Sequence, residues 1–239
     1  MTFLFCVDYY RPRFVIIENV RNLKLSKSSW PYFGRALGCL REMGYNVRET
    51  ILQAGNYGVP QSRNRVIVLA ARKDELLPEF PVATHAFDGK SGAFRTLTVG
   101  DAISDLPRDA NKSERRYESK PLTTPVSFGK EKTLIPWCLP HTADKHNRSG
   151  LYGRLDLNFH FPTVVTFIEP MGTQGRVIHP TENRLISVRE TARAHGFRDG
   201  YIFYGNIADK HCQIGNAVPP PLAAALGRQI LVSVATKEK

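Results

Sequence analysis

The sequence predicts an α/β fold, because continuous apolar runs of strand length alternate with segments of helical periodicity. Residues 14–17 and Val66-Ile-Val-Leu-Ala-Ala71 have the composition of strands buried on both faces. Such strands belong to parallel sheets covered by helices, so we expect both runs in one sheet of this kind. Apolar residues with helical spacing occur at 33–43 and 222–234 and predict the covering helices.

The chain opens with a helical pattern at residues 3–10. We interpret Cys6 in this helix as a core residue, because a reactive thiolate needs an electropositive, partly open setting. The strand at 14–17 then ends in Glu18. In open α/β sheets ligands bind beyond the carboxyl ends of the strands, so Glu18, Asn19 and Arg21 are candidate site residues. Alternatively, they are simply the polar residues that must follow any strand.

The next helix is predicted from an apolar stripe between residues 33 and 43. Ser29 suits its N-cap and Pro31 its first turn, and Gly44 suits its C-terminal end. Residues 47–52 then have the pattern of a further strand.

The loop after that strand leads to Gln61-Ser-Arg-Asn-Arg65. Gly55 and Gly58 in this loop allow the backbone to approach a ligand closely. Side chains at alternate positions of an extended segment point the same way, so Arg63 and Arg65 could reach one small target. The alternative is a pair of solvated charges.

Composition divides the chain into three parts. Pro, Gly, Ser and Thr are frequent between about residues 78 and 184. We therefore predict a sheet domain at 1–77, an inserted irregular domain at 78–186 and a segment at 187–239 that returns to the first domain. In this last segment, Ser187-Val-Arg-Glu190 has the spacing of a capping box and predicts a helix to His195. Gly215 and Asn216 predict a tight turn before the last helix.

The charge indicates a polyanionic partner. The chain has 33 Lys and Arg residues against 22 Asp and Glu, a net charge of +11. Nucleic acid is the natural candidate, although many basic proteins do not bind it.

The cysteines, Cys6, Cys39, Cys138 and Cys212, form no C-x-x-C pair, which disfavours a zinc ribbon or a disulfide framework and fits a reducing compartment. His141 and His146 beside Cys138 match no common finger spacing, so we expect no metal site. No apolar run approaches the roughly 18 residues of a membrane span, so we expect no membrane partner.

Three motifs together resemble the cytosine-5 DNA methyltransferase family. They are Phe14-Val-Ile-Ile-Glu-Asn-Val-Arg21, Gln61-Ser-Arg-Asn-Arg65 and Gln213-Ile-Gly-Asn-Ala-Val-Pro-Pro-Pro221, in this order. The stretches 8–13, 134–141 and 150–154 are similar to its eukaryotic maintenance-type branch. The resemblance implies a Rossmann-like S-adenosylmethionine-dependent methyltransferase fold with an irregular, β-rich target-recognition domain inserted at 78–186. It also implies S-adenosyl-L-methionine as cofactor, double-stranded DNA as substrate, CpG as its context, and the nucleus as location.

Two parts of the family pattern do not occur in this sequence. The family has a glycine-rich loop for S-adenosylmethionine and a later Pro-Cys dipeptide that carries the nucleophile. The chain is similar to the part that follows the Pro-Cys, so we expect a fold that is incomplete at the N-terminus. A chain or segment that supplies the N-terminal half is the expected partner, and we expect the chain to be inactive alone.

The resemblance implies a catalytic role for three residues. Glu18 would contact ring nitrogen N3 of a flipped cytosine, and Arg65 would donate a hydrogen bond to its O2 oxygen. Arg63 would orient Glu18 or a phosphate. Asn216 and Val218 would contact the methyl donor.

The segment Pro170-Met-Gly-Thr-Gln-Gly-Arg176 is similar to the family's base-reading loop, which implies that Met171, Thr173, Gln174 and Arg176 bind DNA. Maintenance-type relatives usually have Lys at the position of Thr173 and a Trp within residues 146–149. These departures put recognition of hemimethylated CpG in question.

Two further hypotheses remain open. A non-catalytic DNA-binding or regulatory remnant would bind DNA with strong salt dependence and transfer no methyl group. An incomplete gene product would unfold broadly and without cooperativity.

Overall fold

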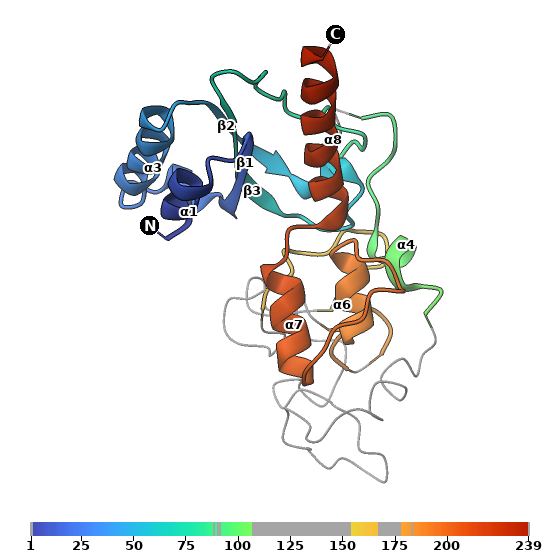
Figure 1. The fold of residues 1–239 in the computed structure, drawn as a ribbon. Helices are drawn as coiled ribbons and strands as arrows, with labels where there is room; N and C mark the ends of the chain where they lie inside the picture. Colours follow the sequence, from blue (N-terminus) through green and yellow to red (C-terminus); the bar gives the residue numbers. More distant parts are fainter. Residues whose placement is uncertain are drawn as a thin grey trace.

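The computed structural model describes residues 2–87, 89, 92–106, 154–166, 178–182 and 184–238. Most of the regular structure lies in the first third and the last fifth of the chain (Figure 1). In order, the elements are α1 (Thr2–Tyr10), β1 (Phe14–Val20), α2 (Asn22–Leu25), α3 (Trp30–Glu42), β2 (Tyr45–Gln53), η1 (Ala54–Tyr57), β3 (Asn64–Arg72), α4 (Val99–Ile103), α6 (Val188–Ala194), α7 (Ile207–Asn216) and α8 (Pro220–Lys237).

The described strands form one sheet in the order β1-β3-β2, and β3 runs antiparallel to both neighbours. The predicted parallel pairing is therefore wrong for these strands. Only residues 54–63 connect β2 to β3, whereas parallel neighbours need a crossover of about a dozen or more residues. β1 and β2 do run in the same direction, but β3 lies between them.

β3 is buried on both faces, as its apolar run predicts. Alternate side chains of a strand point to opposite faces, so β3 contributes to two cores. Val66, Val68 and Ala70 pack with α1 and α3 on one face. Ile67 and Leu69 pack with α8 on the other, and Figure 1 shows these helices on opposite sides of the sheet.

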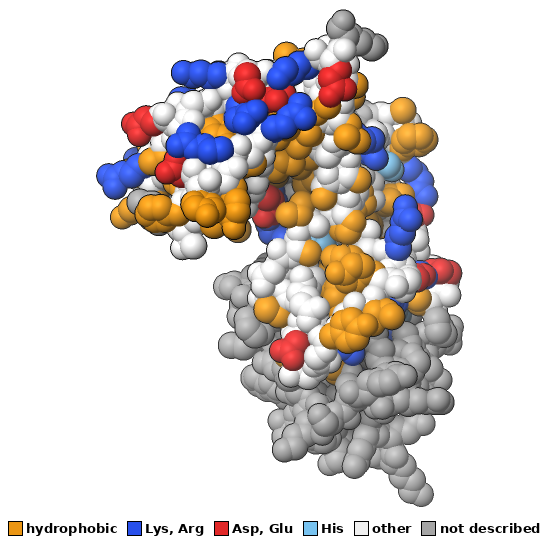
Figure 2. All heavy atoms as spheres, viewed as in Figure 1, with side chains coloured by type: hydrophobic (Ala, Val, Ile, Leu, Met, Phe, Trp, Pro, Cys, Tyr) orange, Lys and Arg blue, Asp and Glu red, His pale blue; other side chains and the backbone are white. Residues whose placement is uncertain are grey.

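β1 is less buried than predicted. Among the described strands it pairs with β3 alone, and Ile16 is 37% exposed, so the expectation of burial on both faces is wrong here. The helix α1 beside it also exposes apolar side chains, including Phe5 at 70%. Cys6 is exposed as well and is not the predicted core residue. In Figure 2, hydrophobic side chains gather on the surface at this α1–α3 end.

A further core lies below the sheet, where α4, α6 and α7 pack together (Figure 1). It joins residues from both sides of the predicted boundary at 186 and 187, and the three-part division stays a prediction. The predicted capping box is present: the Ser187 hydroxyl accepts from the Glu190 amide, and the Glu190 carboxylate accepts from the Ser187 amide. The core consists of Val99, Ile103, Leu155, Phe161, Val164, Ile186, Val188, Ala192, Ala194, Phe203 and Ile214.

The predicted turn at Gly215 and Asn216 is wrong, because both residues end the helix α7. α7 begins with its own capping box, in which Asn206 and Asp209 bond reciprocally. By length and composition alone, Ile207–Lys237 would suit a helix that crosses a membrane. The backbone becomes extended at Ala217 and divides this stretch into α7 and α8.

Candidate functional site

Glu18 and Arg65 meet on one face of the sheet. In the β1–β3 register Glu18 lies opposite Ile67 and Val20 lies opposite Arg65, so the two charged residues are diagonal neighbours. The Nε atom of Arg65 lies 3.0 Å from Oε1 of Glu18, and the side chains are only 13% and 18% exposed. The structure therefore brings together two of the predicted catalytic residues as an ion pair.

The contact within this ion pair is not a well-aligned hydrogen bond. The Oε1 atom of Glu18 is buried, and among the described residues it has the close contact with Nε of Arg65 but no donor with hydrogen-bond geometry. The Nη1 atom of Arg65 instead donates to the carbonyl of Asn64 at 2.9 Å. Burial lowers the pKa of Arg65, whereas the adjacent Glu18 raises it. A ligand N–H group that is better aligned with this carboxylate would therefore fit beside the ion pair.

Arg63 is 2% exposed and serves a different contact. Its Nη1 atom donates to the carbonyl of Val164 at 3.0 Å, and its Nη2 atom donates to the carbonyls of Gly215 at 2.9 Å and Ala217 at 3.2 Å. Burial, followed by the charge of Arg65, lowers the pKa of Arg63 to about 10. It therefore stays charged at neutral pH. The alternative of two solvated arginine charges is wrong for both residues.

Two buried side chains beside Arg63 are functional candidates that sequence reasoning missed. The Nε2 atom of Gln61 donates to the carbonyl of Ala194 and lies 2.9 Å from Nδ1 of His195, while its Oε1 accepts from the amide of Val164. The Nε2 atom of His195 lies 2.9 Å from the carbonyl of Ala217. We call this set the Arg63 junction. It comprises the side chains of Gln61, Arg63 and His195 and the carbonyls of Val164, Ala194, Gly215 and Ala217.

The junction fixes the backbone of residues 215–218, where α7 ends and the chain becomes extended, and this segment carries Asn216 and Val218, the predicted cofactor-binding residues. Arg63 binds the carbonyl on each side of Asn216. Asn216 is exposed, and its Nδ2 atom lies 3.3 Å from Sγ of Cys212. Val218 is partly buried against the core under α8. One exposed amide and one apolar side chain therefore stand on a fixed backbone segment.

Other predicted site residues have different outcomes. Met171, Thr173, Gln174 and Arg176 lie outside the described residues, as do Cys138, His141 and His146. Within the described ranges, no three His, Cys, Asp or Glu side chains gather to hold a metal ion. Glu190 is buried and forms a bidentate pair with Arg184, which gives it a structural role.

Comparison with known proteins shows the family of this chain. The sequence profile described as C-5 cytosine-specific DNA methylase matches residues 1–232. The chain belongs to this family. Among its relatives, DNA (cytosine-5)-methyltransferase 1A of Oryza sativa subsp. japonica is 41% identical over 99% of this chain. DNA (cytosine-5)-methyltransferase 1 of Mus musculus is 37% identical over 96%. The chain spans about a fifth of the length of these C-5 cytosine methylases, 20% and 21% respectively.

Solved structures share the α/β fold of the family. A putative DNA modification methyltransferase from an E. coli prophage has a TM-score of 0.65 at 19% identity, covering 98% of this chain and 73% of that one. The S. pombe Dnmt2 methyltransferase has a TM-score of 0.62 at 18% identity, covering 94% and 68%. The predicted fold class and family are thus confirmed. The methyl donor of C-5 cytosine methylases is S-adenosyl-L-methionine.

The described residues fit one side of a site for this donor. The exposed Asn216 amide can hydrogen-bond polar groups of the donor, and Val218 can contact an apolar portion. Gly215 lets the end of α7 approach the backbone of residues 165 and 166 closely, because a Cβ there would be 2.6 Å from the backbone nitrogen of Thr166. The Arg63 junction therefore holds residues 215–218, which include the predicted cofactor-binding residues, near the strand that carries Arg65.

Proposed function

We propose that this chain is the base-holding part of a DNA (cytosine-5-)-methyltransferase, which acts on a cytosine flipped out of duplex DNA, at CpG. The observation that carries the proposal is the largely buried ion pair of Glu18 and Arg65, in which Nε of Arg65 lies 3.0 Å from Oε1 of Glu18. The pairing edge of cytosine offers an amino donor, N3 and the O2 acceptor. A carboxyl group beside a guanidinium complements that edge.

The chemistry explains why both groups are needed. Carbon 5 of cytosine is not nucleophilic in the aromatic ring, and a thiolate that adds at carbon 6 converts it to an enamine. A protonated Glu18 carboxyl group that donates to N3, together with Arg65 that donates to O2, would relieve the negative charge that builds up on the ring. S-Adenosyl-L-methionine supplies the methyl group. Arg63 would position rather than touch the base, since its nitrogens bind three backbone carbonyls.

The nucleophile and the rest of the donor site would come from a further segment, on the same chain or a partner. The outer edge of β1 supports this part of the proposal. It has no partner strand among the described residues, and free N–H and C=O groups of such an edge accept an added strand. Exposed apolar side chains of the adjoining α1, among them Phe3 and Phe5, would be covered by the same segment.

The remaining contacts would be with DNA in the nucleus. The net charge of +11 favours a polyanionic partner, and Met171, Thr173, Gln174 and Arg176 would read or position the duplex. The same charge also favours the second candidate function, a DNA-binding remnant without catalysis.

Transfer of labelled methyl groups to CpG duplexes tests the proposal. The chain is assayed with and without a separately expressed N-terminal part of the catalytic domain of a related enzyme. We expect transfer only in the mixture. The absence of methyl transfer in a sample that is shown to be folded, and bound to both the added part and DNA, would contradict the proposal. It would favour the second candidate, a DNA-binding remnant without catalysis.

A further inference from the structure

We propose that His195 is a positioning residue, which holds residues 215–218, the segment that carries Asn216 and Val218, at a fixed distance from the strand that carries Arg65. This inference rests on the proposed function, and it assigns a task to a histidine outside the family motifs described above. His195 would touch neither the base nor the methyl donor.

The imidazole of His195 bridges two parts of the chain. It follows the last residue of α6, and its ring is fully buried. On one side Nδ1 lies 2.9 Å from Nε2 of Gln61, which is four residues before Arg65. On the other side Nε2 lies 2.9 Å from the carbonyl of Ala217, which stands between Asn216 and Val218. One ring therefore spans the gap between the two predicted binding elements.

The two contacts define one protonation state. A carbonyl oxygen only accepts, so the Nε2 atom of His195 must carry a proton that it donates to Ala217. The amide of Gln61 then donates to the bare Nδ1 atom, and the neutral imidazole satisfies both partners. The charged groups that face it are Arg63 and Arg65, both cationic, and they oppose protonation. The ring of Phe197 stacks beside it, with centroids 5.9 Å apart, and restrains its orientation.

Arg63 alone does not replace this contact. It also reaches the Ala217 carbonyl, but at 3.2 Å, and it divides Nη2 between that oxygen and Gly215. Removal of the imidazole would leave a cavity beside Gln61 and one fewer bond on Ala217. We expect residues 215–218 to become more mobile and the affinity for the methyl donor to fall, while Glu18 and Arg65 keep their ion pair.

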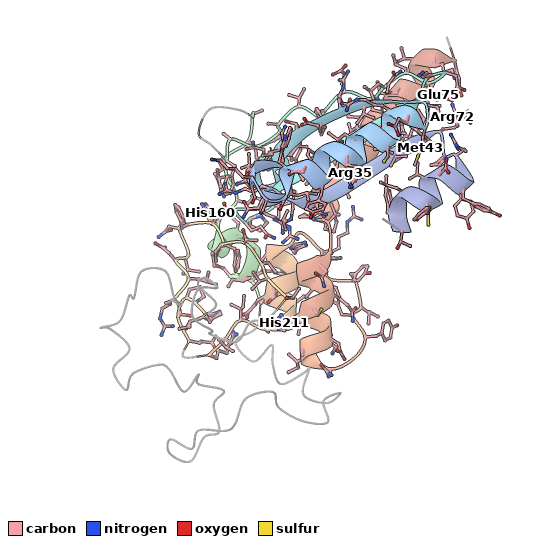
Figure 3. The ribbon with its side chains drawn as sticks, turned by 90° about the vertical axis from the view of Figure 1, so that its left-hand side faces the viewer. Arg35, Met43, Arg72, Glu75, His160 and His211 are labelled. Atoms are coloured by element: carbon pink, nitrogen blue, oxygen red, sulfur yellow. The ribbon has the colours of Figure 1, made fainter. Side chains whose placement is uncertain are left out.

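Two substitutions separate the hydrogen bonds from the packing. His195→Leu retains an apolar side chain but has no donor. His195→Gln can offer a donor to Ala217 through its amide and a carbonyl oxygen to the Nε2 hydrogens of Gln61. His211→Leu is the matched control. His211, on α7 in Figure 3, is 1% exposed, and its ring nitrogens have no hydrogen-bond partner among the described residues.

The kinetic readout uses the chain mixed with the separately expressed N-terminal part. Loss of one buried hydrogen bond corresponds to about a tenfold change, so His195→Leu should raise the KM for S-adenosylmethionine about tenfold. His195→Gln should restore KM to within about threefold of the wild-type value, which corresponds to about half of that free energy. A purely structural role would lower the active fraction and hence the apparent kcat, but it would leave KM unchanged. An unchanged KM in His195→Leu would therefore overturn the proposal.

Amide hydrogen exchange supplies a readout without catalysis. Residues 213–219 should exchange faster in His195→Leu than in the wild type or His211→Leu, and His195→Gln should match the wild type. If the wild-type mixture transfers no methyl group, the proposed function fails, yet exchange still tests the contact. Equal protection of this segment in wild type and His195→Leu would overturn the positioning role.

Discussion

Arg63 and Gly215 are 152 residues apart in the chain, yet the Nη2 atom of Arg63 donates to the carbonyl of Gly215 at 2.9 Å. This contact joins the residue just before the central strand, β3, to the end of α7. Because Arg65 follows two positions later and Asn216 is the next residue after Gly215, the contact sets the distance between the proposed base-holding and cofactor-binding elements. The Arg63 junction is thus both a structural joint and the frame of the proposed site.

Replacement of Arg63 should destabilise the fold more than loss of an ordinary surface charge. Arg63→Met keeps the volume but leaves the carbonyls of Val164, Gly215 and Ala217 with fewer donors. We expect a loss of about 3 kcal/mol in the free energy of unfolding, measured by urea denaturation. Arg41→Met, at an exposed position of α3, should cost no more than about 0.5 kcal/mol. Equal losses in the two variants would contradict the assigned role of Arg63.

Gly215 should not tolerate a side chain. A Cβ at this position would lie 2.6 Å from the Thr166 nitrogen and the Val165 carbonyl carbon, and neither backbone atom can move freely. Gly215→Ala should therefore destabilise the protein by about 1–3 kcal/mol. Gly227→Ala, within α8 and with open space around its Cβ, should instead be neutral or stabilising by up to about 1 kcal/mol. Thermal unfolding of both variants checks this contrast.

Two buried histidines should make the free energy of unfolding decrease as the pH falls below neutral. Burial lowers the pKa of His195 to about 3 and that of His211 to about 4. The unfolded chain, with pKa values near 6.5, then binds more protons than the folded one. Stability is complete above about pH 6.5 and declines down to pH 3–4, with a slope of up to about 1.4 kcal/mol per pH unit for each histidine.

Urea titrations between pH 7 and pH 5 measure this slope. His195→Gln should reduce it, because glutamine does not titrate. A slope that is the same in wild type and His195→Gln would contradict the burial of a neutral His195.

Glu75 should stabilise the far end of the sheet. Its buried carboxylate binds Nε of Arg13 at 2.8 Å and Nζ of Lys237 at 3.1 Å, and Figure 3 shows it beside Arg72. The bond from Arg13 is the main cause that lowers the pKa of Glu75 to about 2. The contribution of Glu75 to the free energy of unfolding is present above pH 4.5 and is lost as the pH falls from 4.5 to 2. Glu75→Gln should therefore unfold at lower urea than wild type at pH 7, and the difference should shrink in this acidic window.

Local patterns in the sequence predict much of the fold. The run Val66–Ala71 identifies the central strand, the stripe at residues 33–43 identifies α3, and the Ser187 capping box identifies α6. Strand direction was predicted wrongly, although the short link between β2 and β3 favours antiparallel pairing. α7 was missed, although Asn206 and Asp209 have capping spacing at its start.

The site was predicted less completely, for a physical reason. Motifs identify Glu18 and Arg65, and the structure pairs them. The partners of Arg63 and Gln61 are backbone carbonyls and a histidine that lie more than 100 positions away, so local periodicity carries no signal for them. The alternating spacing of Arg63 and Arg65 suggests a shared target, whereas the structure gives the two guanidinium groups different contacts.

Methyl transfer by a Glu18→Gln variant tests the central claim most directly. The variant and wild type are each mixed with the separately expressed N-terminal part of a related enzyme's catalytic domain. The kcat is measured at saturating DNA and S-adenosylmethionine. Glu49→Gln, which alters a carboxylate of β2 paired with Lys24, serves as control. The account predicts that Glu18→Gln lowers kcat about 10²–10⁴-fold with unchanged DNA affinity, while the control stays near wild type. A Glu18→Gln enzyme that binds DNA normally and turns over at the wild-type rate would contradict the account.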